Sequence, residues 1–422
     1  MLDIIIKFLN LKEDDVKLCL PTVSGDDAVI FIELYKKPHK CPNCGEMTTK
    51  TKGYHHRIIN HGIFNFQKCI VHYNQRRYQC KFCGRTFNEE CSLVVPYQKK
   101  SLASHLQIMD LAKNPRMTFT MIAKALNLSH TTVINHFYNN LPKFQVLLPR
   151  VLCIDEVYLG RRYSKKYATH LLNFQTNTTI DIFYGRTKDD FRSYLQKMPL
   201  EQRKKVEYVS TDMYEGFRYI SNIYFPNARL CVDSFHVIQL INNNFHDILK
   251  SLLRDYAKGS DEYYLLKSQK ALLLHNSSTI KWFDEHYDHH YRYHLNSLNL
   301  KERLFRIDPI IREAYELKEE YIAFNRLRDI EVIKPKLDIL INKFLTFPHP
   351  NFRKVGRTLL KWKSEIISSF TLIDGRRISN GSIESRNKTI KLLSKNASGY
   401  RNFSHFKLRS IYVINSNKKT GK

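Results

Sequence analysis

The chain has 422 residues, of which 43% are hydrophobic and 12% aromatic, and these values argue against both a single compact core and a disordered chain. Its formal net charge is +28, from 68 basic against 40 acidic residues, and the excess is spread along the whole chain. A polyanionic partner is the simplest explanation, because basic side chains that meet phosphates release condensed counterions, but charge alone does not exclude a basic protein without a nucleic-acid role.

The N-terminal segment does not have the pattern of a secretion signal. Residues 1–7 lack a basic stretch followed by a long apolar run. No uninterrupted apolar segment of the sequence reaches the roughly 20 residues that a membrane span needs. The sequence therefore predicts a cytoplasmic protein without a membrane partner.

Residues 1–95 are expected to form short strands and turns that carry paired cysteines. Two C-x-x-C turns, each followed by a glycine, are formed by Cys41 with Cys44 and by Cys80 with Cys83. Together they offer four thiolates, which complete a closed tetrahedral site, so we expect a zinc ribbon with a structural Zn²⁺. The alternative is a set of unrelated buried thiols. Further candidate ligands, which lack this spacing, are Cys69, His72 and Cys91.

Residues 96–150 are expected to hold a helix-turn-helix domain and a linker. Apolar Ile122 and Leu126 lie at helical spacing in the first helix, and Ser129 can cap the second. The exposed face of the second helix would enter the major groove of DNA. The side chains predicted to contact DNA there are His130, Thr131, Thr132 and Asn135. Any helical hairpin shares part of this pattern, but the paired cysteines and the basic chain favour the DNA-binding interpretation.

The rest of the chain has the pattern of an α/β core with an insertion. In residues 151–238, apolar runs predict three successive strands and then alternating helices and strands, which indicates a mixed sheet. Residues 239–375 have helical spacing with no convincing strand, so we expect an all-helical insertion. Residues 376–422 are expected to return to the core with a final helix and a short basic tail.

Three carboxylates stand out in this core. Asp155 and Asp212 each end an apolar strand, and Glu384 lies in the first turn of the final helix, which Ser382 or Asn380 can cap. Phosphodiester chemistry with two divalent metal ions needs several carboxylates at one edge of a rigid sheet. Taken singly, each residue is better explained as an ordinary cap or surface side chain. Cations for DNA phosphates follow at helical spacing: Lys388, Lys391 and Lys395.

The order of these motifs resembles bacterial insertion-sequence transposases of the ISL-three family. The resemblance spans nearly the whole chain and includes Ile-Asp155-Glu-Val-Tyr, Ser-Thr-Asp212-Met-Tyr and Asn-Gly-Ser-Ile-Glu384-Ser-Arg-Asn. It implies a ribonuclease-H-like core interrupted by a helical insertion before the final glutamate. It also implies that Asp155, Asp212 and Glu384 are a DDE catalytic triad that holds Mg²⁺ or Mn²⁺.

Asp233 and His236 form a further pair at the end of the last strand. Val-Asp233-Ser-Phe-His236 is similar to a motif found in several transposase groups with such insertions. Two interpretations compete. The pair is either a structural clasp between sheet and insertion, or an accessory pair beside the metals, and we favour the second because strand-end position and motif agree.

The sequence therefore predicts a transposase that binds transposon ends and catalyses metal-dependent DNA strand cleavage and transfer. Its expected partners are double-stranded DNA, as terminal inverted repeats and target, and further copies of itself in a homodimer or larger oligomer on the nucleoid. A non-catalytic DNA-binding regulator derived from a transposase is the alternative, and a structure-specific nuclease is a weaker one. A regulator has no need of strand-end carboxylates, and such a nuclease seldom needs a helix-turn-helix.

Overall fold

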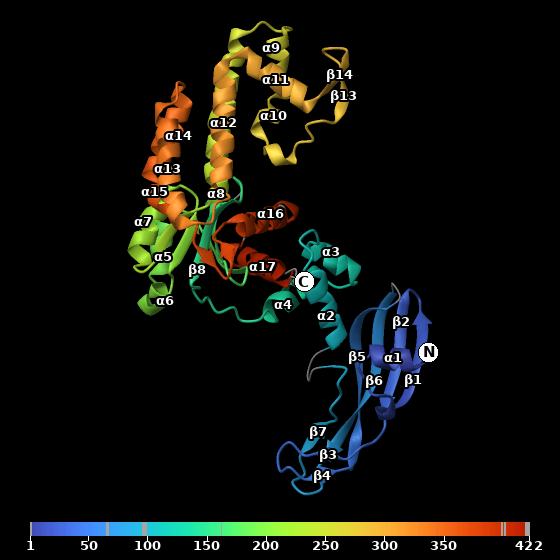
Figure 1. Cartoon of the computed structure of the whole chain (residues 1–422). Helices are drawn as coiled ribbons and strands as arrows, with labels where there is room; N and C mark the ends of the chain where they lie inside the picture. Colours follow the sequence, from blue (N-terminus) through green and yellow to red (C-terminus); the bar gives the residue numbers. More distant parts are fainter. Residues whose placement is uncertain are drawn as a thin grey trace. The chain divides into compact units, whose positions relative to one another are not determined.

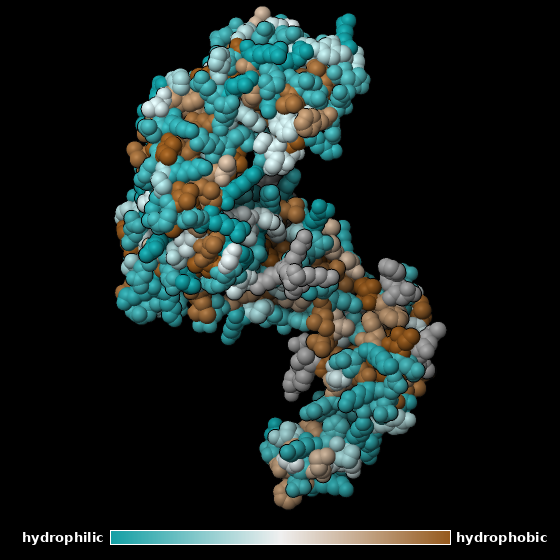
Figure 2. Space-filling model, in the orientation of Figure 1, coloured by the Kyte–Doolittle hydropathy of each residue, from teal (hydrophilic) through white to brown (hydrophobic). Residues whose placement is uncertain are grey.

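The computed structural model describes residues 2–64, 67–94, 99–161, 163–397, 400 and 402–417. The chain divides into two compact units, with Met1–Phe144 and Leu392–Lys422 in unit 1 and Gln145–Lys391 in unit 2. Hydrophilic residues cover most of the visible surface of each unit, with hydrophobic residues interspersed (Figure 2). Residues 418–422, which make up most of the basic tail predicted from the sequence, lie outside the described residues.

Unit 1 begins with helix α1 (Leu2–Phe8) and a five-stranded sheet (Figure 1). The order is β1-β2-β6-β5, with β7 beside β6; β2 is parallel to β6, and β5 is antiparallel to it. Cys69, Val71 and Tyr73 alternate with partly exposed residues along β6, which is the period of two of a strand with one covered face. The strands are β1 (Val16–Ser24), β2 (Asp27–Leu34), β5 (Thr51–Phe64), β6 (Gln67–Gln79) and β7 (Thr86–Asn88).

Unit 1 also contains the helices α2 (Leu102–Leu111), α3 (Phe119–Ala125), α4 (His130–Asn139) and α17 (Phe403–Ser416). The side chains of Ser101, Thr118 and Ser129 cap α2, α3 and α4 by accepting backbone N–H hydrogen bonds. Asn127 turns the chain between α3 and α4 in the left-handed region, at φ 49°.

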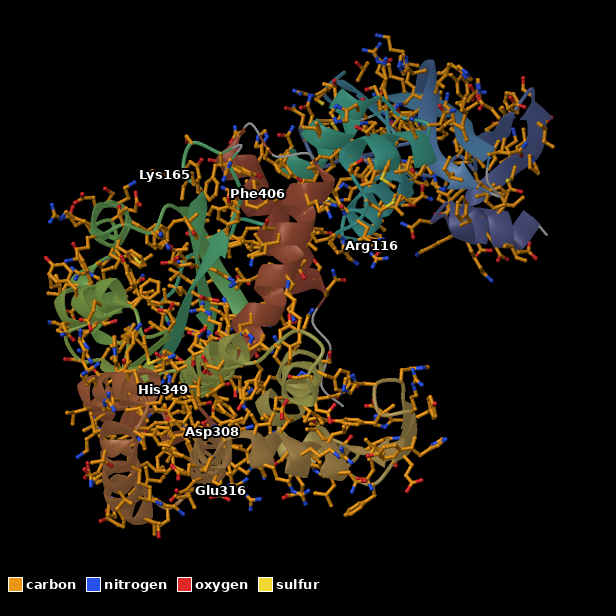
Figure 3. The ribbon with its side chains drawn as sticks, turned by 90° about the horizontal axis from the view of Figure 1, so that it is seen from above. Arg116, Lys165, Asp308, Glu316, His349 and Phe406 are labelled. Atoms are coloured by element: carbon orange, nitrogen blue, oxygen red, sulfur yellow. The ribbon has the colours of Figure 1, made fainter. Side chains whose placement is uncertain are left out.

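Helix α17 packs with α2, α3 and α4 although it is distant in sequence. The Tyr412 hydroxyl donates to the carbonyl of Met109 at 2.9 Å, and the rings of Tyr138 and His405 stack with centroids 4.0 Å apart. Phe406, which Figure 3 labels on this helix, is fully buried. The C-terminal helix is thus part of the same compact unit as the N-terminal helices.

Unit 2 contains the mixed sheet that the sequence predicts. Its order is β10-β9-β8-β11-β12, in which β10, β9 and β8 pair antiparallel and β8, β11 and β12 pair parallel. Val151 and Cys153 pack on one face, while Leu152 and Ile154 pack in a separate apolar cluster on the other, so both faces are covered. The strands are β8 (Val151–Tyr158), β9 (Tyr167–Asn173), β10 (Thr178–Tyr184), β11 (Tyr208–Thr211) and β12 (Arg229–Val232).

Helices cover this sheet and extend beyond it (Figure 1). Between the strands lie α5 (Lys188–Leu195), α6 (Leu200–Lys204) and α7 (Glu215–Tyr224). After β12 come α8 (Ser234–Leu252), α9 (Asp261–Tyr264), α10 (Ala271–Leu274), α11 (Ser297–Ile307), α12 (Pro309–Phe324), α13 (Ile330–Thr346), α14 (Pro350–Lys361) and α15 (Lys363–Ser368), and α16 (Gly381–Asn396) returns to the sheet. Asp308 and His349, both labelled in Figure 3, cap α12 and α14.

The expectation of an insertion without strands is wrong. One short antiparallel hairpin, β13 (Glu285–Asp288) with β14 (Tyr293–Asn296), lies within it, and a second, β15 (Leu372–Ile373) with β16 (Arg376–Arg377), spans its predicted C-terminal boundary. Asp288 and Gly375, beside their turns, make these hairpins possible: the Asp288 carboxylate accepts backbone N–H groups of the turn, and Gly375 adopts φ 73°. Strands this short carry too few residues for a visible period of two. No helix among the described residues has the length and apolarity to cross a lipid bilayer.

Candidate functional site

The four paired cysteines converge on one point in unit 1. Their sulfurs all lie within 4.8 Å of one another, with Cys41 Sγ 3.6 Å from Cys83 Sγ and Cys44 Sγ 3.5 Å from Cys80 Sγ. A zinc ion with bonds of about 2.3 Å needs tetrahedral sulfur edges of roughly 3.8 Å, so the cluster fits Zn²⁺ after a small expansion.

Local backbone geometry builds this cluster. Gly45 and Gly84 follow the second cysteine of each pair at φ 80° and 71°, where a side chain would be strained. Their N–H groups close each turn onto the carbonyls of Cys41 and Cys80, and the hairpin of β3 (His39–Lys40) with β4 (Met47–Thr48) frames the first turn. A hydrogen bond from the backbone N–H of Cys83 lowers the pKa of the Cys80 thiol, which favours the thiolate that zinc binds.

The other candidate zinc ligands lie elsewhere. Cys69 is fully buried in the apolar core of the sheet, and Cys91 packs against that same core. His72 shares a hydrogen bond with His56 at 3.0 Å. Among the described residues, none of the three belongs to the four-sulfur cluster.

Three aspartates of unit 2 lie towards one edge of its sheet, and the prediction that Asp155 ends its strand is wrong, because β8 goes on pairing with β9 as far as Tyr158. Strands β8, β11 and β12 are parallel neighbours, with Ser210 opposite Cys153 and Thr211 opposite Val232. Asp155 follows Cys153 by two residues, and Asp212 and Asp233 directly follow Thr211 and Val232. Since carboxyl ends of adjacent parallel strands meet at one edge, three acidic side chains are carried there on rigid backbone.

Helix α16 brings Glu384 to the same place. Asn380, and not Ser382, precedes the helix: its carbonyl accepts the N–H groups of Ile383 and Glu384 at 2.9 and 3.2 Å. The Asn380 side chain donates to the carbonyl of Ile154 at 3.2 Å, which ties the start of α16 to the strand position next to Asp155. Ile383 is buried beneath the helix, so its first turn is anchored on both sides.

Asp233, His236 and Glu384 form a compact cluster at this edge. Their ligand atoms all lie within 4.8 Å of one another, and His236 Nε2 lies 3.8 Å from Glu384 Oε1. Asp233 Oδ2, Asp212 Oδ1 and His236 Nε2 are buried, and each lacks a hydrogen-bond partner among the described residues. Buried polar atoms normally have partners, so unpaired ones grouped in this way suit a bound cation.

Burial also shifts the acidity of this group. It raises the pKa of Asp155 to about 6, and the carboxylates of Asp212 and Glu384 add to the effect while His236 opposes it. The pKa values of Asp212, Asp233 and Glu384 are also raised, in each case chiefly by burial. Crowded carboxylates that resist ionisation are typical of a site that a metal ion neutralises.

A hydrogen-bonded chain that the sequence analysis missed supports Asp155. The Asn387 amide donates to Asp155 Oδ2 at 2.7 Å, His170 Nδ1 lies 2.8 Å from Asn387 Oδ1, and His170 Nε2 lies 2.9 Å from the Thr179 hydroxyl. Asn387 follows Glu384 by three residues on one helix face, a spacing that could have indicated it. His170 is hidden inside an apolar strand, where no spacing marks it.

The chain was compared with known proteins. Residues 152–410 match a transposase family profile, DDE transposase ISL3, and residues 37–83 match the zinc finger of transposases IS204, IS1001, IS1096 and IS1165. The chain belongs to the ISL3 family of transposases. It is 20% identical over 412 residues to the transposase for insertion sequence element IS1001 of Bordetella parapertussis, covering 94% of each chain.

A second relative is matched over a shorter stretch. The transposase chain is 25% identical over 176 residues, 42% of its length, to a protein of Lactococcus lactis subsp. lactis named an ATP-dependent protease. It spans half the length of that protein.

The remaining predicted residues of the transposase lie on two helices. On α4, His130, Thr131 and Asn135 are exposed and Thr132 is half-buried, while Val133 and Phe137 face the core. On α16, Lys388, Lys391 and Lys395 are exposed. Both sets are therefore free to meet a polyanion.

Proposed function

We propose that this transposase cleaves and joins DNA strands at transposon ends with Asp155, Asp212 and Glu384 as its catalytic carboxylates. The observation that carries the proposal is that Asp155 lies on β8 and Asp212 directly after the adjacent parallel strand β11, and that the charges of Asp212 and Glu384 both act on the Asp155 carboxyl, although the compact cluster at this edge contains only Glu384 of the three. A DNA-binding regulator would gain nothing from this arrangement, because unpaired buried polar atoms cost about 1–3 kcal/mol each.

The donor atoms fit a divalent metal ion. Carboxylate oxygens on rigid elements suit Mg²⁺ or Mn²⁺, and the pKa of Asp155 is raised first by burial and then by the neighbouring carboxylates, whose negative charge such an ion would balance. Bound metal would activate the attacking water or 3′-hydroxyl and stabilise the leaving oxygen. Asp155, Asp212 and Glu384 would hold it, and Asn387 would keep Asp155 oriented.

The strand order β10-β9-β8-β11-β12 supports a ribonuclease-H-like core. In this interpretation the helical segment after α8 is an insertion that separates Asp212 from Glu384 in sequence. The core, insertion and N-terminal domain boundaries predicted from the sequence remain predictions.

DNA recognition is proposed for unit 1. Helices α3 and α4, joined at Asn127, have the form of a helix-turn-helix, with His130, Thr131, Thr132 and Asn135 on the face that would meet base edges. The zinc ribbon would stabilise the neighbouring fold, and the lysines of α16 would contact phosphates. The partners would be terminal inverted repeats, target DNA and, in a dimer or larger oligomer, further copies of the chain.

The experiment incubates purified protein with Mg²⁺ and a plasmid that carries the transposon ends, and maps the nicks. Asp155→Ala should abolish cleavage while end binding persists, because the variant loses a metal ligand but no DNA-reading side chain. Asp189→Ala is the matched control, since this aspartate is exposed on α5, and it should cleave normally. Normal cleavage by Asp155→Ala would require a different active site.

A further inference from the structure

We propose that Asp233, His236 and Glu384 form a second cation position of the catalytic centre, one that includes an imidazole nitrogen among its ligands. The proposal rests on the proposed function and deepens it, because it assigns to Asp233 and His236 direct contact with a metal ion. Three side chains from two elements carry it: Asp233 and His236 at the start of α8, and Glu384 in the first turn of α16.

Their backbone setting directs two donor atoms to one point. The His236 N–H donates to the carbonyl of Asp233 at 3.1 Å, which holds the two residues on one tight turn. Backbone N–H groups of Asn380 and Phe235 bond to the Asp233 carboxylate. Oδ2 of that carboxylate remains buried without a partner among the described residues, on a side chain that is 1% exposed.

A purely structural clasp does not account for these atoms. The bond from the Asn380 N–H to the Asp233 carboxylate does tie the sheet to the segment before α16, but it leaves Asp233 Oδ2 and His236 Nε2 without partners among the described residues. His236 Nε2 lies 3.8 Å from Glu384 Oε1, beyond hydrogen-bond distance but suitable for two ligands that share an ion. A cation between them would satisfy Asp233 Oδ2 and His236 Nε2 together.

Both carboxylate oxygens of Asp155 have hydrogen-bond donors, unlike Oδ2 of Asp233. We therefore distinguish two cation positions within the catalytic centre. Its Oδ1 accepts the N–H of Glu156 at 2.8 Å and its Oδ2 accepts the Asn387 amide at 2.7 Å. Asp155 with Asp212 thus offers only oxygen donors, whereas the Asp233 cluster offers a nitrogen as well. Two adjacent ions about 4 Å apart are a common solution for in-line phosphodiester chemistry.

The nitrogen ligand predicts a metal preference. Mn²⁺ binds oxygen ligands but accepts an imidazole nitrogen more readily than Mg²⁺, which strongly favours oxygen ligands. The second cation position should therefore bind Mn²⁺ more tightly than Mg²⁺. Removal of the imidazole should reduce the difference between the two affinities.

The test titrates Mn²⁺ alone into the zinc-loaded full chain and records electron paramagnetic resonance. Wild-type protein should show hyperfine coupling between bound Mn²⁺ and a ¹⁴N nucleus. His236→Gln should lose the nitrogen coupling and weaken Mn²⁺ binding roughly 10-fold or more, and Asp233→Asn should weaken it similarly. His246→Ala, a histidine change on the same helix, should retain both signals, and circular dichroism checks that each variant is folded.

The outcomes separate the two proposals. Nitrogen coupling that persists in His236→Gln, or is missing from the wild type, overturns the second position even if Asp155-dependent cleavage is observed. Coupling that depends on His236 supports the second position even if the protein fails to cleave transposon ends, in which case the proposed function fails instead.

Discussion

At the scale of single residues, the orientation of Asp155 is set by a fully buried histidine. Burial lowers the pKa of His170 to about 4, so its ring is neutral near pH 7. In the geometry observed, Nδ1–H can donate to Asn387 Oδ1 while Nε2 accepts from the Thr179 hydroxyl. This leaves the Asn387 amide hydrogens directed at Asp155, which lies on β8 across from His170 on β9. A ligand fixed in this way needs less reorganisation when metal binds.

Asn387→Ala should therefore slow strand cleavage at least about 10-fold, a typical loss when a partner that orients a metal ligand is removed. Binding to transposon ends, measured by gel shift, should be unchanged, because Asn387 is buried and the exposed lysines of α16 remain. Ser385→Ala, an exposed change on the same helix, is the control and should cleave at the wild-type rate. If Asn387→Ala cleaves DNA at the wild-type rate, the Asn387 amide contributes only to packing and does not orient Asp155.

At the scale of elements, local patterns were predictable and long-range ones were not. The cysteine turns, and the position of Asp212 directly after β11, depend on spacing and on the burial of a strand, which the sequence displays directly; the end of β8 beyond Asp155 was not predictable in this way. A second helix after the Glu384 helix was not predicted, and the contacts of α17 with Met109 and Tyr138 join residues far apart in sequence, which no periodicity encodes. The hairpin of β13 and β14 could not be predicted because its strands are too short to show alternation, and His170 could not because it lies inside an apolar strand.

The zinc ribbon offers the sharpest test at this scale. Cys80→Ser should lose the bound zinc and unfold the ribbon, because metal binding and folding are coupled in such sites. Metal analysis should find about one zinc per chain in the wild type, in keeping with the single four-sulfur cluster among the described residues. Cys91→Ala, outside the cluster, should keep its zinc. If the ribbon stays folded in zinc-free protein, the arrangement of the four cysteine sulfurs does not depend on a bound metal ion.

At the scale of the whole molecule, the charge of +28 and the division into two units suggest two kinds of DNA contact. Exposed lysines on α16 can neutralise phosphates, which strengthens binding to any sequence and makes it dependent on salt. In the proposed helix-turn-helix, polar side chains on α4 would contact base edges, which would distinguish one sequence from another. Only the second kind would direct a transposase to its own ends.

Asn135→Ala and Lys391→Ala should separate these roles. Loss of a base-edge contact costs about 1–3 kcal/mol of discrimination, so Asn135→Ala should weaken binding to transposon ends roughly 10-fold while random DNA of equal length binds as before. Lys391→Ala should weaken binding to both duplexes alike and reduce the slope of log K against log salt by about 0.9. Fluorescence anisotropy at several salt concentrations measures both quantities on the same samples. An equal loss on random DNA in Asn135→Ala would place this residue at the phosphate backbone, and recognition of the ends would then lie on another surface of unit 1.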